Sequence, residues 1–192
     1  DATAYGIAKA AINPYCNTAN PTYGFYASAG NGYAMQGDGN KRDSSTNASY
    51  GGSSTSGNTI VGIAVKAGKI YFSLDGTWQN SGDPAAGSGE AFSGITGIWT
   101  PTFALNGSYA GILNAGQDGT FAGTETAGGN SDASGYGNFF SAVPTGFKAL
   151  CAGNLPTADA ISPAETDDNY PQKLFSAKTY SGSGSTQTIS GV

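Results

Sequence analysis

The stretch that most constrains the fold is residues 57–79, GNTIVGIAVKAGKIYFSLDGTWQ, where apolar side chains alternate with small or polar ones on both sides of a glycine turn. If Ala67 and Gly68 form a two-residue hairpin loop, Val65 faces Ile70 and the pairing continues outward from there. Opposed residues point to the same side of the sheet, and a slip of one residue would send one strand's apolar set to the other face. The pattern therefore predicts a hairpin whose apolar face lines the interior between two layers of strands. The members of this face are Val61, Ile63, Val65, Ile70, Phe72 and Leu74.

A second hairpin signal follows at Asp75 and Gly76. Glycine tolerates the positive φ that the favoured two-residue turns need. This turn places Trp78 opposite Ser73 and on the same face as Tyr71, away from the apolar stripe. Residues 57–79 are thus expected to form a meander with one buried face. This alternation is typical of a structural scaffold.

Composition extends this expectation to the whole chain. Of 192 residues, 31 are Gly and only 11% are charged, while 38% are hydrophobic, which is enough to build a core. No sustained apolar pattern has the helical period, and short β-rich runs alternate with Gly and Asn. These features predict an all-β fold with one domain, or one domain plus a fragment of another.

The remaining strands are expected in short runs separated by Gly, Pro and Asn. Pro101 lacks an N–H group, so its strand is expected at a sheet edge or a bulge. Residues 117–138 form a long excursion with few apolar residues, and such loops are usually functional or held by their own contacts. The expected strands cover residues 2–12, 23–28, 32–37, 48–50, 97–107, 109–116 and 147–151.

The charge pattern excludes some partners. The net charge is −5, and the eight basic residues are scattered, whereas phosphate binding needs clustered Lys and Arg. No apolar run is long enough to span a bilayer. We therefore expect no nucleic-acid partner and no membrane insertion.

The two cysteines, Cys16 and Cys151, leave two alternatives open. A disulfide between them would close a long loop and stabilise the chain by about 4–5 kcal/mol in the chain-entropy model. Two buried thiols are the other alternative, because small secreted scaffolds usually carry more bridges. With no His and two Cys, a zinc site is excluded, and we expect no cofactor.

The carboxylates do not form a catalytic pattern. Sandwich glycosidases need two carboxylates a few ångströms apart. Here Glu90 lies in a Gly/Ser loop, Glu125 in the long excursion and Glu165 near the C-terminus. A Ser-His-Asp triad is impossible without His. We therefore expect no catalytic residues.

The excursion also resembles the first half of a calcium loop, with Asn130, Asp132 and Ser134 at alternate positions before Gly135. The bidentate Glu expected later is replaced by Ser141, so one carboxylate would have to suffice unless Asp118 joined it. The alternative is a loop held by Asx turns, in which side chains bond nearby backbone groups. We expect no metal ion.

Aromatic side chains are the remaining candidates for recognition. Trp78, Tyr33 and Tyr50 could together contact a protein partner or stack on a sugar. The alternative is that tyrosines near loops only cap the rim of a sandwich.

Three stretches carry a family resemblance. Residues 57–79 resemble the central meander of SPRY (B30.2-like) domains, although Asn58 stands where that family usually has Asp. Residues 114–156, NAGQDGTFAGTETAGGNSDASGYGNFFSAVPTGFKALCAGNLP, resemble the C-terminal half of SPRY-type domains in virion proteins of tailed bacteriophages, with Ala115 in place of the usual Phe. Residues 180–192 are similar to a segment that opens a further β domain in such proteins.

The resemblance implies a concanavalin-A-like sandwich of two antiparallel sheets over residues 1–156, with its first strands missing. Residues 157–171 are expected to be an acidic linker, and residues 172–192 the first β-hairpin of a further domain or interaction segment. Both ends look cut, so we interpret the chain as a piece of a longer protein.

The resemblance also implies a function. We expect a non-enzymatic structural protein on the exterior of the virion, a module of a fibre, tail or capsid-decorating protein. Its expected partners are other virion subunits, including further copies of itself, and a host-surface glycan or receptor. The alternative is a lectin-like carbohydrate-binding module, and a third is an unusual glycosidase.

Overall fold

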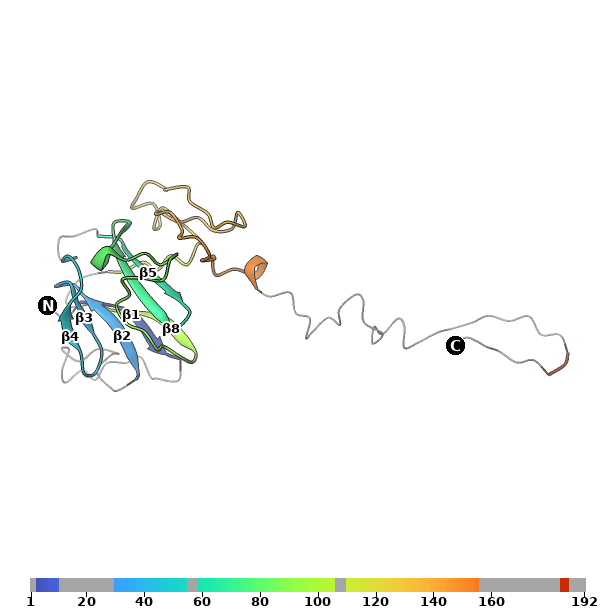
Figure 1. The fold of residues 1–192 in the computed structure, drawn as a ribbon. Coiled ribbons are helices and arrows are strands. Elements are labelled where there is room, and N and C mark those ends of the chain that lie inside the picture. The colour runs from blue at the N-terminus through green and yellow to red at the C-terminus, as the bar shows by residue number, and fades with distance from the viewer. Residues whose placement is uncertain (1–2, 11–29, 55–58, 106–109, 156–183, 187–192) are drawn as a thin grey trace. The chain divides into compact units, whose positions relative to one another are not determined.

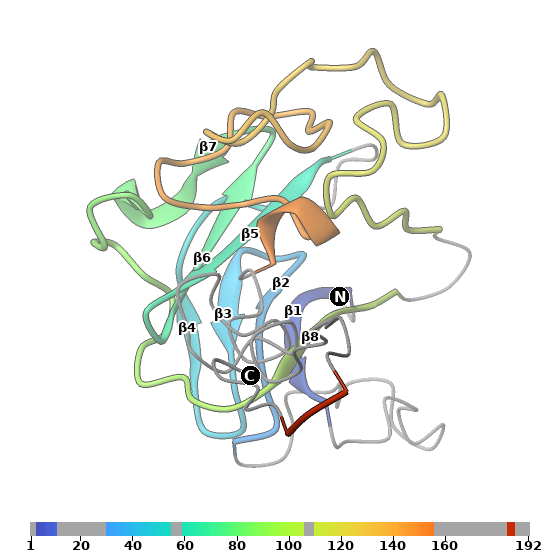
Figure 2. The same cartoon turned by 90° about the vertical axis from the view of Figure 1, so that its right-hand side faces the viewer.

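The computed structural model describes residues 3–10, 30–54, 59–105, 110–155 and 184–186. Within these ranges the chain contains strands, turns and two short 3-10 helices, and no α-helix. The strands form two antiparallel sheets, which can be followed strand by strand in Figures 1 and 2. The predicted all-β fold with two antiparallel sheets is confirmed.

The chain divides into two compact units, Asp1–Cys151 and Ala152–Val192. All the described strands belong to the first unit, and the second contains the 3-10 helix Ala152–Asn154. The expected linker and C-terminal hairpin lie outside the described residues, apart from 184–186, and stay predictions.

The larger sheet has five strands in the order β4–β3–β2–β1–β8. Strand β8 is an outer strand, which confirms the edge position expected from Pro101. Gly6 in β1 is tightly enclosed, because a Cβ there would come within 2.8 Å of the Cα of Ala34. The strands are β1 (Ala4–Lys9), β2 (Gly32–Gln36), β3 (Asn40–Arg42), β4 (Asn47–Ser49) and β8 (Trp99–Ala104).

The smaller sheet is the predicted meander, in the order β5–β6–β7, and its register is the expected one. Val65 pairs with Ile70, and Ser73 pairs with Trp78 across the second turn. The turn residues Ala67 and Gly68 have φ values of 49° and 73°, the left-handed backbone that a tight hairpin needs. The strands are β5 (Val61–Lys66), β6 (Lys69–Leu74) and β7 (Thr77–Trp78).

The main core joins the two sheets. Ile7 and Met35 from the larger sheet pack with Ile70 and Phe72 from β6, and Tyr50, Ala91 and Ile95 complete the buried cluster. Because one cluster takes side chains from both sheets, the sheets face each other across it, as in a β-sandwich.

The apolar stripe of the meander departs from the prediction in two ways. Val65 is 42% exposed rather than interior, because it lies on the outer strand β5 next to the hairpin turn. On the opposite face of β6, Tyr71 and Ser73 are buried, so this strand has two buried faces instead of one. The expectation that six apolar residues line the interior on a single buried face was therefore wrong for Val65 and for β6.

The second buried face of β6 has a cause that lies further along the chain. Residues 82–95 follow the edge of β6 that faces away from β5, where Ile70 donates to the Phe92 carbonyl at 3.1 Å and accepts from the Ala91 N–H at 2.8 Å. Lys69 adds an ion pair with Glu90, 3.2 Å between Nζ and Oε1. A Cβ on Gly87 of this segment would come within 3.9 Å of the Tyr71 hydroxyl, so the segment also lies beside Tyr71.

Two of the expected strands are absent from the described residues. Residues 147–151 and the described part of 109–116 have no strand pairing. In the second case side chains take the amide hydrogens that a ladder would use: Ala115 N–H donates to Gln117 Oε1 at 2.6 Å and Gly116 N–H donates to Asn114 Oδ1 at 2.7 Å. The expected strand at 23–28 lies outside the described residues.

Candidate functional site

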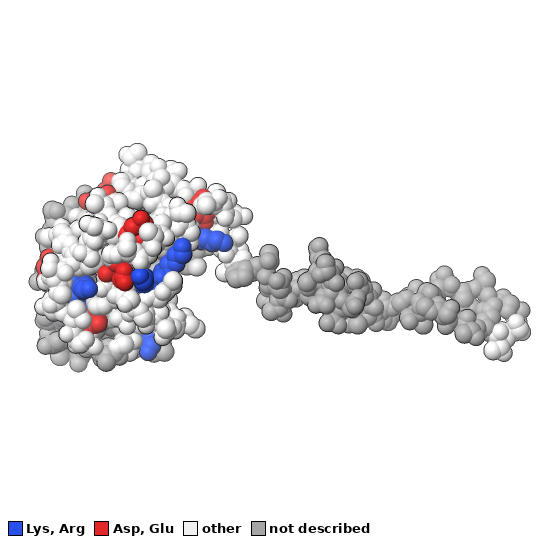
Figure 3. Space-filling model, in the orientation of Figure 1, with Lys and Arg blue, Asp and Glu red and all other residues white. Residues whose placement is uncertain are grey.

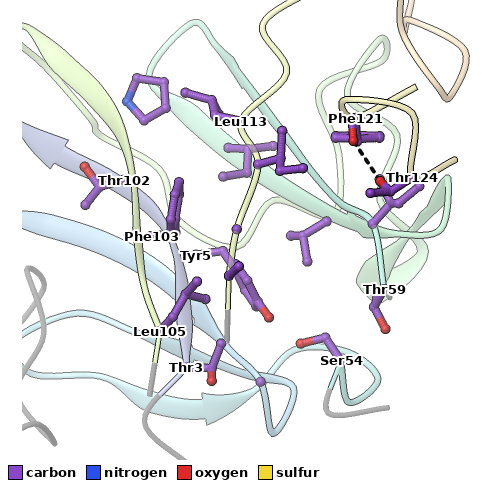
Figure 4. Close-up of a pocket in the computed structure, with 18 of the residues that line it drawn as sticks. Thr3, Tyr5, Ser54, Thr59, Thr102, Phe103, Leu105, Leu113, Phe121 and Thr124 are labelled. Atoms are coloured by element: carbon purple, nitrogen blue, oxygen red, sulfur yellow. Dashed lines mark hydrogen bonds between the residues drawn. The ribbon is translucent and has the colours of Figure 1, made fainter. Parts of the chain in front are cut away.

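A cavity of about 620 Å³ opens on the flank of the first unit, between the outer strands β5 and β8. Its lining also includes Tyr5 from β1, Gly37, Ser54, and residues from 110–113 and 121–125. Figure 4 shows Tyr5, Phe103 and Leu105 gathered on one side, with Thr59 and Thr124 on the opposite side. The cavity has the size of a binding pocket for a small molecule or a few side chains.

The cavity exists because this flank is only partly filled. Phe103, Ile112 and Leu113, all in its lining, are 42%, 49% and 48% exposed. Residues 110–116 pass the flank without forming a strand, so they do not close it with a ladder. Several large apolar side chains are thus presented together to solvent, which is typical of a contact surface.

Ser54 supplies an unusual polar group at the cavity wall. Its side chain is buried, and its Oγ has no hydrogen-bond partner among the described residues. Elsewhere in the lining, the hydroxyl of Thr124 is engaged, since it donates to the Phe121 carbonyl at 2.8 Å (Figure 4). A buried hydroxyl without a partner costs about 1–3 kcal/mol, so Ser54 is a group that an occupant of the cavity could satisfy.

Strand β5 presents a row of backbone groups beside the cavity. The N–H and C=O groups of Ile70 bond to Phe92 and Ala91 and not to β5. Val65, which is paired with Ile70, therefore lies at a non-hydrogen-bonded position of the β5–β6 pair. By the two-residue alternation, the N–H and C=O groups of Val61, Ile63 and Val65 all point to the outer edge. Within the described residues no hydrogen bond reaches this row. Strand β5 is therefore an open edge.

Strand β8, the other outer strand at the cavity, is protected. The Ala10 N–H donates to the Ile98 carbonyl at 3.1 Å, so Ile98 bonds toward the β1 side. By the two-residue alternation of an antiparallel pair, the backbone groups of Thr100, Thr102 and Ala104 also bond toward β1. The outward positions include Pro101, which has no N–H to offer. The two edges at the cavity thus differ in their capacity to accept a further strand.

The structure does not bring together the three aromatic residues predicted to bind a partner or glycan. Tyr50 is 5% exposed, lies edge-on to Phe72, and donates its hydroxyl to the Gly89 carbonyl at 2.9 Å. Burial raises the pKa of Tyr50 to about 12. Its ring is part of the core and offers no free face to a sugar.

Tyr33 and Trp78 have different surroundings. Tyr33 is half-buried, with ring centroids 5.1 Å from Phe92 and 5.4 Å from Trp99. Trp78 is half-buried on β7, opposite Ser73. Among the described aromatic residues no ring contact joins Tyr33, Tyr50 and Trp78, so recognition by the three together stays a prediction without structural support.

The glutamates are placed separately. Glu90 lies on the surface beside Lys69, and a hydrogen bond from its own backbone N–H, followed by that from Lys69, lowers its pKa. Figure 3 shows basic and acidic side chains lying next to each other on the face that it draws. Glu125 is the one carboxylate among the described residues that line the cavity, and Glu165 lies outside the described residues.

The excursion is held by Asx interactions, which confirms that alternative for residues 130–135. The buried carboxylate of Asp132 accepts N–H bonds from Ser134 at 2.9 Å, Tyr136 at 3.0 Å and Ala149 at 2.9 Å. Asp118 accepts from Thr120 and Ala122 in the same way. Both carboxylates thus serve as acceptors for amide hydrogens.

Metal and thiol groups add little to the site. Over the described residues, no group of three His, Cys, Asp or Glu side chains could hold a metal ion. Cys151 is half-buried, and Cys16 lies outside the described residues, so their pairing stays a prediction. No described helix is long and apolar enough to cross a membrane.

The cavity residues were missed by sequence reasoning because they come from segments far apart in the chain. One signal was present: Phe103 and Leu105 alternate in the run that Pro101 assigns to an edge. No protein-family model matches the chain, and no curated protein is similar enough to match it.

Proposed function

We propose that this chain is a non-enzymatic structural and interaction module of a tailed-bacteriophage virion, part of a fibre, tail or capsid-decorating protein on the particle exterior. The resemblance of residues 57–79 and 114–156 to SPRY-type virion domains supports the proposal. The two antiparallel sheets agree with that class of domain.

The observation that carries the proposal is the incompletely filled flank between β5 and β8. It combines an apolar cavity of about 620 Å³, the exposed side chains of Phe103, Ile112 and Leu113, and an open strand edge. Surfaces of this kind are covered by a partner in the assembled state. A module that works through contacts with neighbouring subunits accounts for all three features.

The charges around the flank favour binding over catalysis. Glycoside hydrolysis uses two carboxyl groups about 5–9.5 Å apart. Glu125 is alone among the carboxylates of the described cavity lining, and Glu90 is held by Lys69. The cavity lining is otherwise apolar or hydroxyl-bearing.

The test is immunogold labelling of phage particles produced from the genome that encodes the chain, with antibodies raised against residues 1–192. We expect gold on the exterior of intact particles, and particles lacking the gene as the control should stay unlabelled. A protein found only in the lysate and never on particles would overturn the virion assignment. Polysaccharide turnover that is lost in Glu125→Gln would overturn the non-enzymatic assignment.

A further inference from the structure

We propose that the partner at this flank is a second copy of the same chain, which pairs its β5 with β5 of the first copy in antiparallel orientation and extends the three-stranded sheet across a two-fold axis. The inference rests on the proposed role as an interaction module, because it names the partner of the same flank. It specifies the strand, the register and the charges involved.

The open edge supplies the hydrogen bonds. The N–H and C=O groups of Val61, Ile63 and Val65 point outward, at intervals of two residues. A strand edge in this state is a template for another strand. An antiparallel copy of the same row matches it group for group, which is the requirement for an interface between identical surfaces.

The register follows from the same row. Centring the pair on Ile63 places Ile63 opposite its own copy and Val61 opposite Val65 of the partner, so every outward group meets a complementary one. In this register Ile60 lies opposite Lys66 of the partner. Shifting the pair by one residue would set outward groups against groups that already bond to β6.

Charge complementarity favours the same register. The Asp75 carboxylate accepts the Ile60 N–H at 2.8 Å, which fixes a negative charge at the start of β5. Lys66, an exposed residue, ends the strand with a positive charge. Antiparallel pairing brings Lys66 of each copy beside Asp75 of the other, and it separates the two Lys66 side chains.

The remaining edges are less suited to this contact. Strand β8 carries Pro101 at an outward position, β4 has three residues, and β7 has two. Strand β5 has six residues, none of them Pro, with the exposed Val65 at one end and the cavity alongside. Pairing of β5 would also cover the apolar flank that contains Ile63.

The test measures the mass of the full chain by sedimentation and light scattering over a concentration series. We expect a dimer whose dissociation constant is raised at least about tenfold by Val65→Lys, because a lysine at an edge opposes strand addition. Val65→Thr is the matched control: it keeps a β-branched side chain without charge and should remain dimeric. Val65 is exposed, so both variants should fold, which circular dichroism checks.

Lys66→Glu tests the charges. It places two acidic groups together and should weaken the dimer by about fivefold at low salt, an effect that fades as salt screens it. Lys66→Met, which removes the charge without reversing it, should change the dissociation constant less. Equal effects of both variants would contradict the proposed register.

Residue-resolved hydrogen exchange provides a readout of the strand itself. In the dimer the amides of Val61, Ile63 and Val65 should be protected, and they should exchange faster in the Val65→Lys monomer. The amides of Gly62 and Ala64, which face β6, should change little. A wild-type monomer at all concentrations, or a dimer that Val65→Lys leaves intact, would overturn the inference. Labelled particles with a monomeric chain would reject self-pairing alone, whereas a dimer absent from particles would reject the virion role alone.

Discussion

The meander at residues 59–79 and the excursion at residues 117–138 are both poor in charge and contain several Gly, yet they are held in place by different means. The meander uses a backbone ladder and apolar packing, with Ile70 and Phe72 fully buried. The excursion uses side chains of Asp and Asn that accept or donate hydrogen bonds to the backbone, above all Asp132. A strand needs alternation over many residues, whereas a loop of this kind depends on a few polar side chains.

The largest effect should come from the meander. Phe72→Ala removes a fully buried ring from the shared core and is expected to lower the free energy of unfolding by about 3–5 kcal/mol. Chemical denaturation of the full chain measures this. Val65→Ala changes an exposed residue on the same face of the sheet and should cost less than about 1 kcal/mol. Similar losses of unfolding free energy in Phe72→Ala and Val65→Ala would contradict the finding that Phe72 is buried and Val65 exposed.

The excursion should respond to a single polar change. Asp132→Ala leaves the amides of Ser134, Tyr136 and Ala149 without their acceptor, at an expected cost of about 2–3 kcal/mol. Hydrogen exchange should speed up at these three amides while β6 stays protected. Asp132→Asn keeps an acceptor oxygen and should cost less. Loss of protection throughout β6 would show that the two regions are not independent.

Ser54 belongs to neither arrangement, since its buried Oγ has no partner among the described residues. Ser54→Ala removes an unsatisfied hydroxyl and is expected to leave the free energy of unfolding unchanged or to raise it by up to about 1 kcal/mol. Thermal and urea unfolding measure the change. A loss of more than about 1 kcal/mol would show that the hydroxyl is satisfied in the folded chain.

The smallest effect concerns pH. The Thr120 hydroxyl, followed by the backbone N–H groups of Thr120 and Ala122, lowers the pKa of Asp118 in the folded chain. A depressed folded-state pKa contributes stability above the unfolded value, near 3.9 for Asp, and this contribution is lost as pH falls through the folded pKa. NMR titration should show the shift, and Thr120→Val should move the pKa back up. If the pKa of Asp118 does not rise in this variant, the Thr120 hydroxyl is not the cause of its depression.

The sequence predicted the meander well because its determinants are local. Apolar residues alternate from Val61 to Val65 and again from Ile70 to Leu74, and the turns at Ala67 and Asp75 are each two residues long. The register could therefore be worked out from the residues alone. The edge position of β8 was likewise predictable from Pro101, whose missing N–H is a property of one residue.

The rest depended on contacts between distant segments. Burial of Tyr71 requires residues 82–95 to return to β6, and the core position of Tyr50 requires both sheets. Asn114 and Gln117 turn residues 109–116 away from a strand through side-chain bonds that compete with a ladder. The cavity arises where several of these segments leave one flank partly unfilled. The position of such a cavity cannot be predicted from a local sequence pattern.

The two covered faces of β6 have a consequence for biosynthesis. Tyr71 leaves the ribosome before residues 82–95, which pair with the edge of β6 and place Gly87 beside the Tyr71 hydroxyl. Until that later segment emerges, the aromatic ring of Tyr71 is more exposed to solvent in a nascent chain that has formed the hairpin. A translational pause just after Trp78 would therefore lengthen the time in which a chaperone can bind, and completion of residues 82–95 would end it.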